Sequence, residues 1–136
     1  MQRIIADSSL RDKLYVLKDR KEAGKLLAQR LLGYKGTNGI VLSIPSGGVP
    51  VAAEIAKAIM LPLDLIIVRK VQIPYNPEAG FGAVGPDSKV LLNEELLRSL
   101  DLSQKEVEQQ IQMTMNIIKR RNELFRKGLP FPLVKN

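Results

Sequence analysis

Residues 39 to 70 read GIVLSIPSGGVPVAAEIAKAIMLPLDLIIVRK, and this stretch decides the fold class. Ile40 to Ile44 is a short, apolar and β-branched run of the kind that forms a strand buried on both faces. Val51 to Met60 is rich in alanine and isoleucine, which predicts a helix that lies flat on a sheet. Leu63 to Val68 predicts a second strand. The order strand, helix, strand is typical of a parallel β-α-β unit, so we expect an α/β fold with helices flanking a parallel sheet.

The turn between the first strand and the helix is the candidate site. Ser46, Gly47 and Gly48 supply backbone that a ligand can approach closely, and they precede the positive end of a helix. Free N–H groups in such a turn bind anions. Arg69 and Lys70 follow the second strand, and ligands of parallel sheets bind at the carboxyl ends of strands. The glycines alone are equally compatible with an ordinary connection, but the two cations favour anion binding.

Capping residues predict the remaining helices. Asp19 with Glu22 forms a capping box before a helix that ends at Gly33. Its expected apolar stripe consists of Ala23, Leu26, Leu27 and Leu31. Its basic residues, which we assign to a solvated face in preference to a nucleic-acid surface, are Arg20, Lys21, Lys25 and Arg30.

Two more helices are predicted in the carboxyl-terminal part of the chain. Asn93 caps a short helix from Glu94 to Leu100. Ser103 with Glu106 forms a capping box that opens a long helix to about Lys127. The expected apolar face of this long helix consists of Val107, Ile111, Met115, Ile118 and Phe125.

Residues 71 to 89, VQIPYNPEAGFGAVGPDSK, are rich in proline and glycine and predict a long connection. Connections of this length are often lids or binding loops. Within it, Phe81 to Val84 and Val90 to Leu92 can pair as a small hairpin. Gly80 to Gly85 matches G-x-G-x-x-G, but we reject a dinucleotide site because that signature must follow a strand and open a helix.

Composition and charge limit the classes of function that this chain can have. The 136 residues fit one domain, residues 1 to 136, of ordinary globular composition. The formal charge of +7 favours anionic partners, either phosphorylated metabolites or nucleic acid. The chain has no cysteine and no histidine, so thiol chemistry, histidine-based catalysis and the usual zinc ligand sets are excluded. It carries no apolar run long enough to span a bilayer, so no membrane partner is expected and we expect a cytoplasmic protein.

Four blocks of the sequence, in this order and spacing, resemble the amino-terminal half of a type I phosphoribosyltransferase of the small prokaryotic kind. These blocks are IPSGGVPVAAEIAKA (44 to 58), LDLIIVRK (63 to 70), IPYNPEAGFGAVG (73 to 85) and VLLNEELL (90 to 97). The similarity runs from about Tyr15 to the end of the chain. It implies a transferase that displaces pyrophosphate from Mg²⁺-bound phosphoribosyl pyrophosphate with a nitrogenous base, in nucleotide metabolism.

The resemblance assigns roles to several residues. Ser46, Gly47 and Gly48 match the pyrophosphate-binding turn, in which the family usually has arginine or lysine where this chain has Ser46. Arg69 and Lys70 match the basic pair that neutralises pyrophosphate oxygens. Tyr75 to Gly85 falls where the family has a mobile hood over the active site. The resemblance therefore assigns Tyr75, Asn76 and Glu78 to the hood. Tyr75 is also a candidate stacking surface for the base. No residue is assigned a catalytic role or a metal, and Mg²⁺ is expected to arrive with the substrate.

The chain lacks the motif that completes such a site. In the family, two adjacent carboxylates and a glycine- and threonine-rich loop bind the ribose hydroxyls and the 5′-phosphate. Neither Asp-Asp nor Glu-Asp occurs in this sequence. We therefore expect a partial fold without the carboxyl-terminal strands and the donor loop, inactive unless a separate carboxyl-terminal half is supplied. An open sheet edge also predicts a homo-oligomer.

Two other classes of function stay open. One is a non-catalytic phosphate- or nucleotide-binding module that works through a partner subunit, favoured by Ser46 and the absent carboxylates. The other is a basic nucleic-acid-binding protein, which rests on charge alone and is disfavoured because aromatic residues are scarce.

Overall fold

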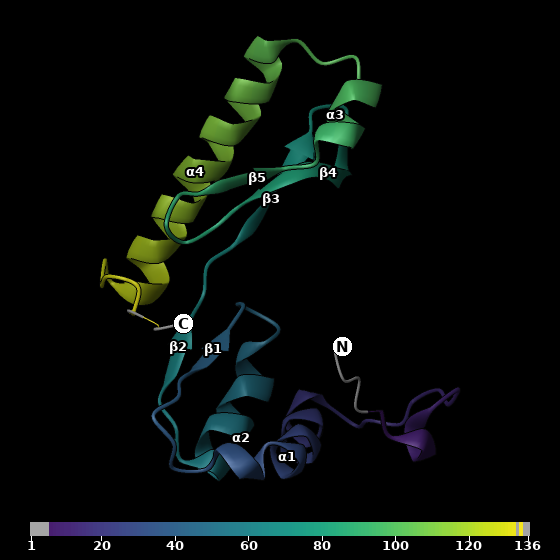
Figure 1. The fold of residues 1–136 in the computed structure, drawn as a ribbon, viewed down its shortest axis with the longest axis vertical. Helices are drawn as coiled ribbons and strands as arrows, with labels where there is room; N and C mark the ends of the chain where they lie inside the picture. The colour runs from purple at the N-terminus through teal and green to yellow at the C-terminus, as the bar shows by residue number, and fades with distance from the viewer. Residues whose placement is uncertain (1–5, 133, 135–136) are drawn as a thin grey trace. The chain divides into compact units, whose positions relative to one another are not determined.

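The computed structural model describes residues 6–132 and residue 134, which divide into two compact units. The first unit contains the described residues up to 41 together with residues 46–63. The second contains residues 42–45 and the described residues from 64 onwards. Each unit has a hydrophobic core of its own. Figure 1 shows the order of the elements along the chain. Among the described residues, no helix is both long enough and apolar enough to cross a membrane.

Two helices form the body of the first unit. α1 spans Arg20–Arg30 and α2 spans Val49–Ile59, with Pro50 in the first turn of α2. Short 3-10 helices flank α1, namely η1 (Ser8–Leu10) and η2 (Leu32–Tyr34). Both predicted helices of this region are therefore present.

The backbones of α1 and α2 touch. A Cβ atom placed on Gly24 of α1 would lie 2.5 Å from the carbonyl oxygen of Val51 in α2, so only glycine fits at this position. Ala28, Ile55 and Ile59 form the buried core around the contact. The close approach explains why small residues of α1, rather than its leucines, face α2.

The predicted apolar stripe of α1 was therefore partly wrong. Gly24 and Ala28 are the buried residues of this helix. Leu26 and Leu27 are 39% and 48% exposed and line a surface groove of about 480 Å³ together with Leu10 and Leu17. A leucine side chain at the α1–α2 contact would hold the helices apart, and this outweighs its greater hydrophobicity.

The central β-α-β unit is present, with shorter strands than the sequence predicts. β1 (Val41–Ser43) and β2 (Leu63–Leu65) pair in a two-stranded sheet, and α2 connects them. The N–H of Ile66 donates to the carbonyl oxygen of Ser43 at 2.9 Å. Both strands run in the same direction (Figure 1), which confirms the parallel arrangement with flanking helices.

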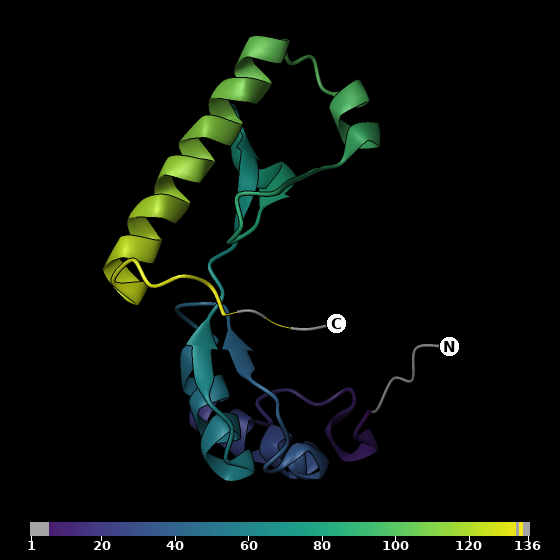
Figure 2. The same ribbon diagram turned by 60° about the vertical axis from the view of Figure 1, so that its left-hand side comes forward.

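The second unit is an antiparallel sheet covered by a long helix. The sheet has the order β3-β4-β5, and α4 lies along one of its faces in both views (Figures 1 and 2). The bounds of the elements are β3 Arg69–Ile73, β4 Asn76–Val84, β5 Val90–Leu92, α3 Glu94–Ser99 and α4 Gln104–Arg126.

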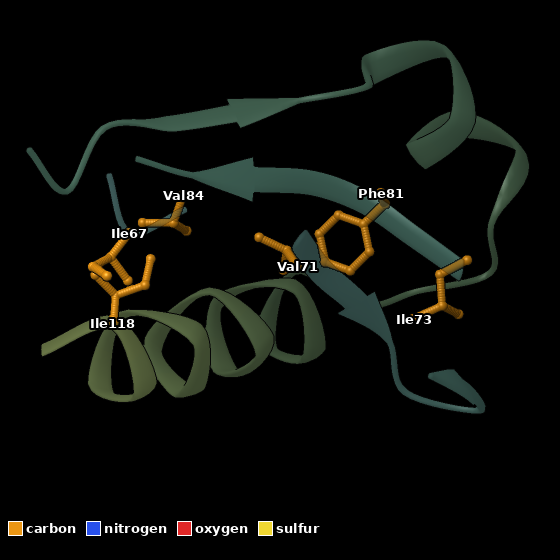
Figure 3. Close-up of a cluster of buried hydrophobic side chains, with 6 residues drawn as sticks. All are labelled: Ile67, Val71, Ile73, Phe81, Val84 and Ile118. Atoms are coloured by element: carbon orange, nitrogen blue, oxygen red, sulfur yellow. The ribbon is translucent and has the colours of Figure 1, made fainter. Parts of the chain in front are cut away.

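Phe81 is at the centre of the second core. Its side chain has no exposed surface and points from β4 toward α4, next to Val71 of β3 (Figure 3). Ile67, Val84 and Ile118 close the other end of the same cluster. Val107, Ile111 and Met115, predicted for the apolar face of α4, pack against this core, whereas Phe125 is 46% exposed.

Residues 71 to 89 are not the long connection that their prolines and glycines predict. They form part of β3, all of β4 and the turn to β5, and Ile73 of β3 is paired with Asn76 of β4 across a turn at Pro74 and Tyr75. The register of the β3–β4 pairing shifts on either side of Gln72. The smaller hairpin between β4 and β5 is confirmed, with Gly82 opposite Leu92.

The glycines of β4 serve close packing between strands. A Cβ on Gly80 would lie 2.9 Å from the carbonyl oxygen of Val71, and one on Gly82 would lie 2.6 Å from that of Leu91. Gly80 to Gly85 thus lie on a strand and the turn after it, and this turn leads to β5 and not to a helix.

The caps of α3 and α4 are as predicted. The Asn93 side chain accepts the N–H of Leu96 at 3.0 Å. At α4 the capping box is complete: the Ser103 hydroxyl accepts the N–H of Glu106 at 3.3 Å, and the Glu106 carboxylate accepts the N–H of Ser103 at 2.8 Å. At α1 the cap is different, because the Glu22 carboxylate accepts the N–H of Lys18 rather than that of Asp19.

Candidate functional site

The turn before α2 presents backbone donors. The Ser46 carbonyl oxygen accepts the N–H of Val49 at 3.2 Å, and that of Gly48 accepts the N–H of Ala52 at 2.9 Å. Gly48 caps α2 without a side-chain bond. No described residue accepts a hydrogen bond from the N–H groups of Gly47 and Gly48. These donors precede the positive end of an eleven-residue helix, which is the local chemistry that attracts phosphate oxygens.

A cation from another element lies beside this turn. A Cβ on Gly47 would lie 3.6 Å from Nε and 3.7 Å from Nη2 of Arg20. Arg20 is exposed and is the first residue of α1. The exposure of Arg20 agrees with the predicted solvated face, but its position beside the turn was not predicted. The signal that could have located it is the spacing of Arg20, Gly24 and Ala28, which puts small residues on the same side of α1 as the arginine.

Contrary to the sequence prediction, Arg69 and Lys70 do not directly follow the second strand. β2 ends at Leu65, and the two basic residues open β3, where they are paired with Val84 and Ala83 of β4. The predicted second strand was too long: β2 ends at Leu65, and Ile67 is buried in the core of the second unit. The Lys70 ammonium donates to the backbone carbonyl of Glu78. The turn belongs to the first unit and the basic pair to the second, so a shared site stays a prediction.

The predicted hood residues lie at the tip of the β3–β4 hairpin. Tyr75 occupies the turn and is 67% exposed, and Asn76 and Glu78 are exposed residues of β4. The Gln72 side chain donates to the carbonyl oxygen of Pro77 at 2.8 Å, next to the Glu78 carbonyl that Lys70 binds. The tip is thus a strand pair held by two side chains of β3, and not an open loop.

The carboxylates of the described residues do not form a metal site. Among these residues, no group of three or more carboxylates could hold a metal ion. Asp87 is engaged at the β4–β5 turn, where its carboxylate binds the Lys89 ammonium at 2.9 Å. The hydrogen bond from Lys89 lowers the pKa of the Asp87 carboxyl below its ordinary value.

Comparison with known proteins identifies the family. The model of the phosphoribosyl transferase domain matches residues 16–99. The chain belongs to this family. Arg20, the turn from Ser46 to Gly48, the basic pair Arg69 and Lys70, and the hairpin tip all lie inside the matched range of this phosphoribosyl transferase domain.

The phosphoribosyl transferase domain has similar relatives in two bacteria. Two proteins from strains of Mycobacterium tuberculosis, each named "Putative phosphoribosyl transferase", are 42% identical to it over 110 residues. That alignment covers 81% of this chain and 25% of each relative. A crystal structure of a protein from Thermus thermophilus has a TM-score of 0.71 and 36% identity to the chain, covering 88% of this chain and 57% of that one. The chain thus spans about a quarter of the length of the mycobacterial relatives.

Proposed function

We propose that this chain binds the pyrophosphate part of magnesium phosphoribosyl pyrophosphate. The observation that carries the proposal is the turn from Ser46 to Gly48, whose free N–H groups lie at the start of α2 inside the family match. Peptide N–H groups at this position suit the oxygens of a diphosphate. We further propose that Arg69 and Lys70 neutralise part of its charge, because no described carboxylate forms an ion pair with either side chain.

In the complete reaction, a nitrogen of the acceptor base would attack C1 of the ribose. The bond from C1 to the pyrophosphate oxygen breaks, and its electron pair leaves with pyrophosphate. Donors and cations directed at that oxygen stabilise the developing charge, which is the electrostatic contribution that lowers the barrier. Ser46 to Gly48, Arg69 and Lys70 would act on the leaving group, and Tyr75 is the candidate stacking surface for the base.

Calorimetric titration tests the proposal. Pyrophosphate and phosphoribosyl pyrophosphate, each with Mg²⁺, are titrated into the wild-type chain, Arg69→Ala and the control Arg120→Ala. Arg120 is an exposed cation on α4, so its variant has the same net charge as Arg69→Ala. We expect binding by the wild type that weakens about tenfold in Arg69→Ala and is unchanged in the control. Absence of binding by the wild type would overturn the proposal.

A second candidate is a non-catalytic phosphate- or nucleotide-binding module that acts through a partner subunit. The sequence favours it at two points: Ser46 replaces the family's basic residue, and no Asp-Asp or Glu-Asp pair is present. An assay for release of pyrophosphate from phosphoribosyl pyrophosphate in the presence of nitrogenous bases separates the two candidates when a separate carboxyl-terminal half is supplied. Turnover in that mixture supports the transferase, and binding without turnover there supports the module.

Three further expectations belong to this proposal. Self-association is expected from unpaired strand edges, and light scattering at high concentration measures it. A cytoplasmic location is expected for an enzyme that uses a phosphorylated intracellular metabolite.

Nucleic-acid binding would give an affinity for random oligonucleotides that falls steeply as the salt concentration rises. We expect only weak binding of this kind.

A further inference from the structure

We propose that Arg20 is a pyrophosphate-binding residue and supplies the cation that Ser46 does not. The inference rests on the proposed function, because it takes the turn from Ser46 to Gly48 as the pyrophosphate site. It adds a residue from α1, which lies outside the turn and outside the basic pair of β3.

The position of Arg20 follows from the packing of α1 on α2. Arg20, Gly24 and Ala28 are successive residues at a spacing of four, so they share one side of α1. Gly47, Val51 and Ile55 have the same spacing in the chain that leads into and through α2.

These two rows face each other. Arg20 lies beside Gly47, Gly24 lies against the Val51 carbonyl, and Ala28 shares a buried cluster with Ile55. The contact at Gly24 is so close that it fixes the register of the two helices. The first residue of α1 must then lie next to the turn.

Two hydrogen bonds fix the start of α1. The Asp19 carboxylate accepts the N–H of Glu22 at 2.8 Å and so caps the helix. The Glu22 carboxylate in turn accepts the N–H of Lys18. Arg20 lies between these residues, so the backbone from which its side chain extends is already fixed before a ligand binds.

The guanidinium group of Arg20 is available to an anion. No described residue accepts a hydrogen bond from it or forms an ion pair with it, whereas Arg30 of the same helix binds Asp7 at 3.0 Å. A guanidinium group has a permanent charge and a planar set of donors that matches two phosphate oxygens. Next to Gly47 it adds a charged donor to neutral N–H groups.

The absence of a side chain at Gly47 keeps this arrangement open. A Cβ there would only touch the guanidinium, at 3.6 Å, but a longer side chain would occupy the space between Arg20 and the backbone donors. The site therefore offers a diphosphate one charged side chain and the free N–H groups of Gly47 and Gly48.

The test compares three variants of the full 136-residue chain. Arg20→Gln removes the charge, Arg20→Lys keeps it without the planar fork, and Lys21→Gln is the matched control that removes a charge from the next residue of α1. Magnesium pyrophosphate is titrated into each by calorimetry. Amide spectra with ¹⁵N labelling follow Gly47 and Gly48 in the same samples.

We expect Arg20→Gln to bind about tenfold to a hundredfold more weakly, Arg20→Lys to recover part of the loss, and Lys21→Gln to bind like the wild type. Wild-type binding that shifts the Gly47 and Gly48 amides but is unaltered in Arg20→Gln would overturn the role of Arg20 and leave the proposed function intact. Wild-type binding without those shifts, or no binding, would overturn both. Arg20 is exposed, and circular dichroism checks that each variant is folded.

Discussion

The guanidinium of Arg126 binds the carboxylate of Asp64, 62 residues earlier in the chain. Arg126 is 6% exposed, and it also donates to the carbonyl oxygens of Leu65 and Pro130, each at 2.7 Å. Its guanidinium lies 5.7 Å from the centre of the Phe131 ring. One buried cation thus joins the end of α4 to β2 and to the segment that follows α4.

Arg126→Ala should lower the free energy of unfolding of the second unit by about 3 kcal/mol, because it leaves a carboxylate and two carbonyl groups without their donor. Urea unfolding followed by circular dichroism measures the change. Arg120→Ala removes an exposed cation of the same helix and should change it by no more than about 0.5 kcal/mol. Equal midpoints for the two variants would show that the Arg126 contacts contribute nothing to stability.

Gly24→Ala should destabilise the first unit by about 1 to 3 kcal/mol, because the new Cβ would lie 2.5 Å from the Val51 carbonyl oxygen and 2.8 Å from Cβ of Glu54. The same unfolding experiment measures it. Gly33→Ala is the control, since a Cβ there meets no atom within 4 Å. A Gly24→Ala variant as stable as this control would mean that α1 and α2 separate without loss of stability.

Ser46→Arg should strengthen binding of magnesium pyrophosphate about tenfold, because it places a permanent cation in a turn that offers only neutral donors. In the Arg20→Gln background the gain should replace part of the lost affinity. Calorimetric titration of the single and double variants measures both effects. An affinity unchanged by the added arginine would argue that the anion does not bind at Ser46.

The stability of α4 should depend on pH through Glu106. Hydrogen bonds from the Ser103 hydroxyl and N–H lower the pKa of the Glu106 carboxyl below its ordinary 4.5. A carboxyl group whose pKa is lower in the folded state stabilises that state above the ordinary pKa, and the contribution is lost as the pH falls through the folded value. Glu106→Gln should therefore melt at a lower temperature than the wild type at pH 7, and the difference should shrink below about pH 4.

Circular dichroism melting between pH 7 and about pH 3 measures this difference. Glu123→Gln is the matched control, because Glu123 is exposed on the same helix and makes no hydrogen bond to a described side chain. The prediction fails if Glu106→Gln and Glu123→Gln follow the same course with pH.

The sequence predicts those elements whose signals are local. α2 follows from the Gly-Gly turn and Pro50, and the starts of α3 and α4 follow from Asn93 and Ser103, whose side chains cap the nearest N–H groups. Patterns of this kind depend on residues within a few positions of one another, so tertiary packing does not overrule them.

The β3–β4 hairpin and the position of Arg20 could not be predicted in the same way. Pro74, Pro77, Gly80 and Gly82 are typical of loops, yet the two glycines lie in β4, where neighbouring carbonyl oxygens leave no room for a Cβ. Leucines usually form the buried face of a helix, but α1 packs through Gly24 instead. In each case the deciding contact comes from a residue distant in the sequence. Neither the periodicity of apolar residues nor the residue type predicts such a contact.

The bond from the Lys70 ammonium to the Glu78 carbonyl means that this lysine already has a partner within its own hairpin. An anion that draws the Lys70 ammonium away from Glu78 breaks this bond, so part of its binding free energy goes into breaking it. The hairpin tip then loses one of the two side chains that hold it and keeps the bond from Gln72. Ligand affinity and the looseness of the tip are therefore thermodynamically linked, and a change that weakens the Lys70 bond to Glu78 increases both.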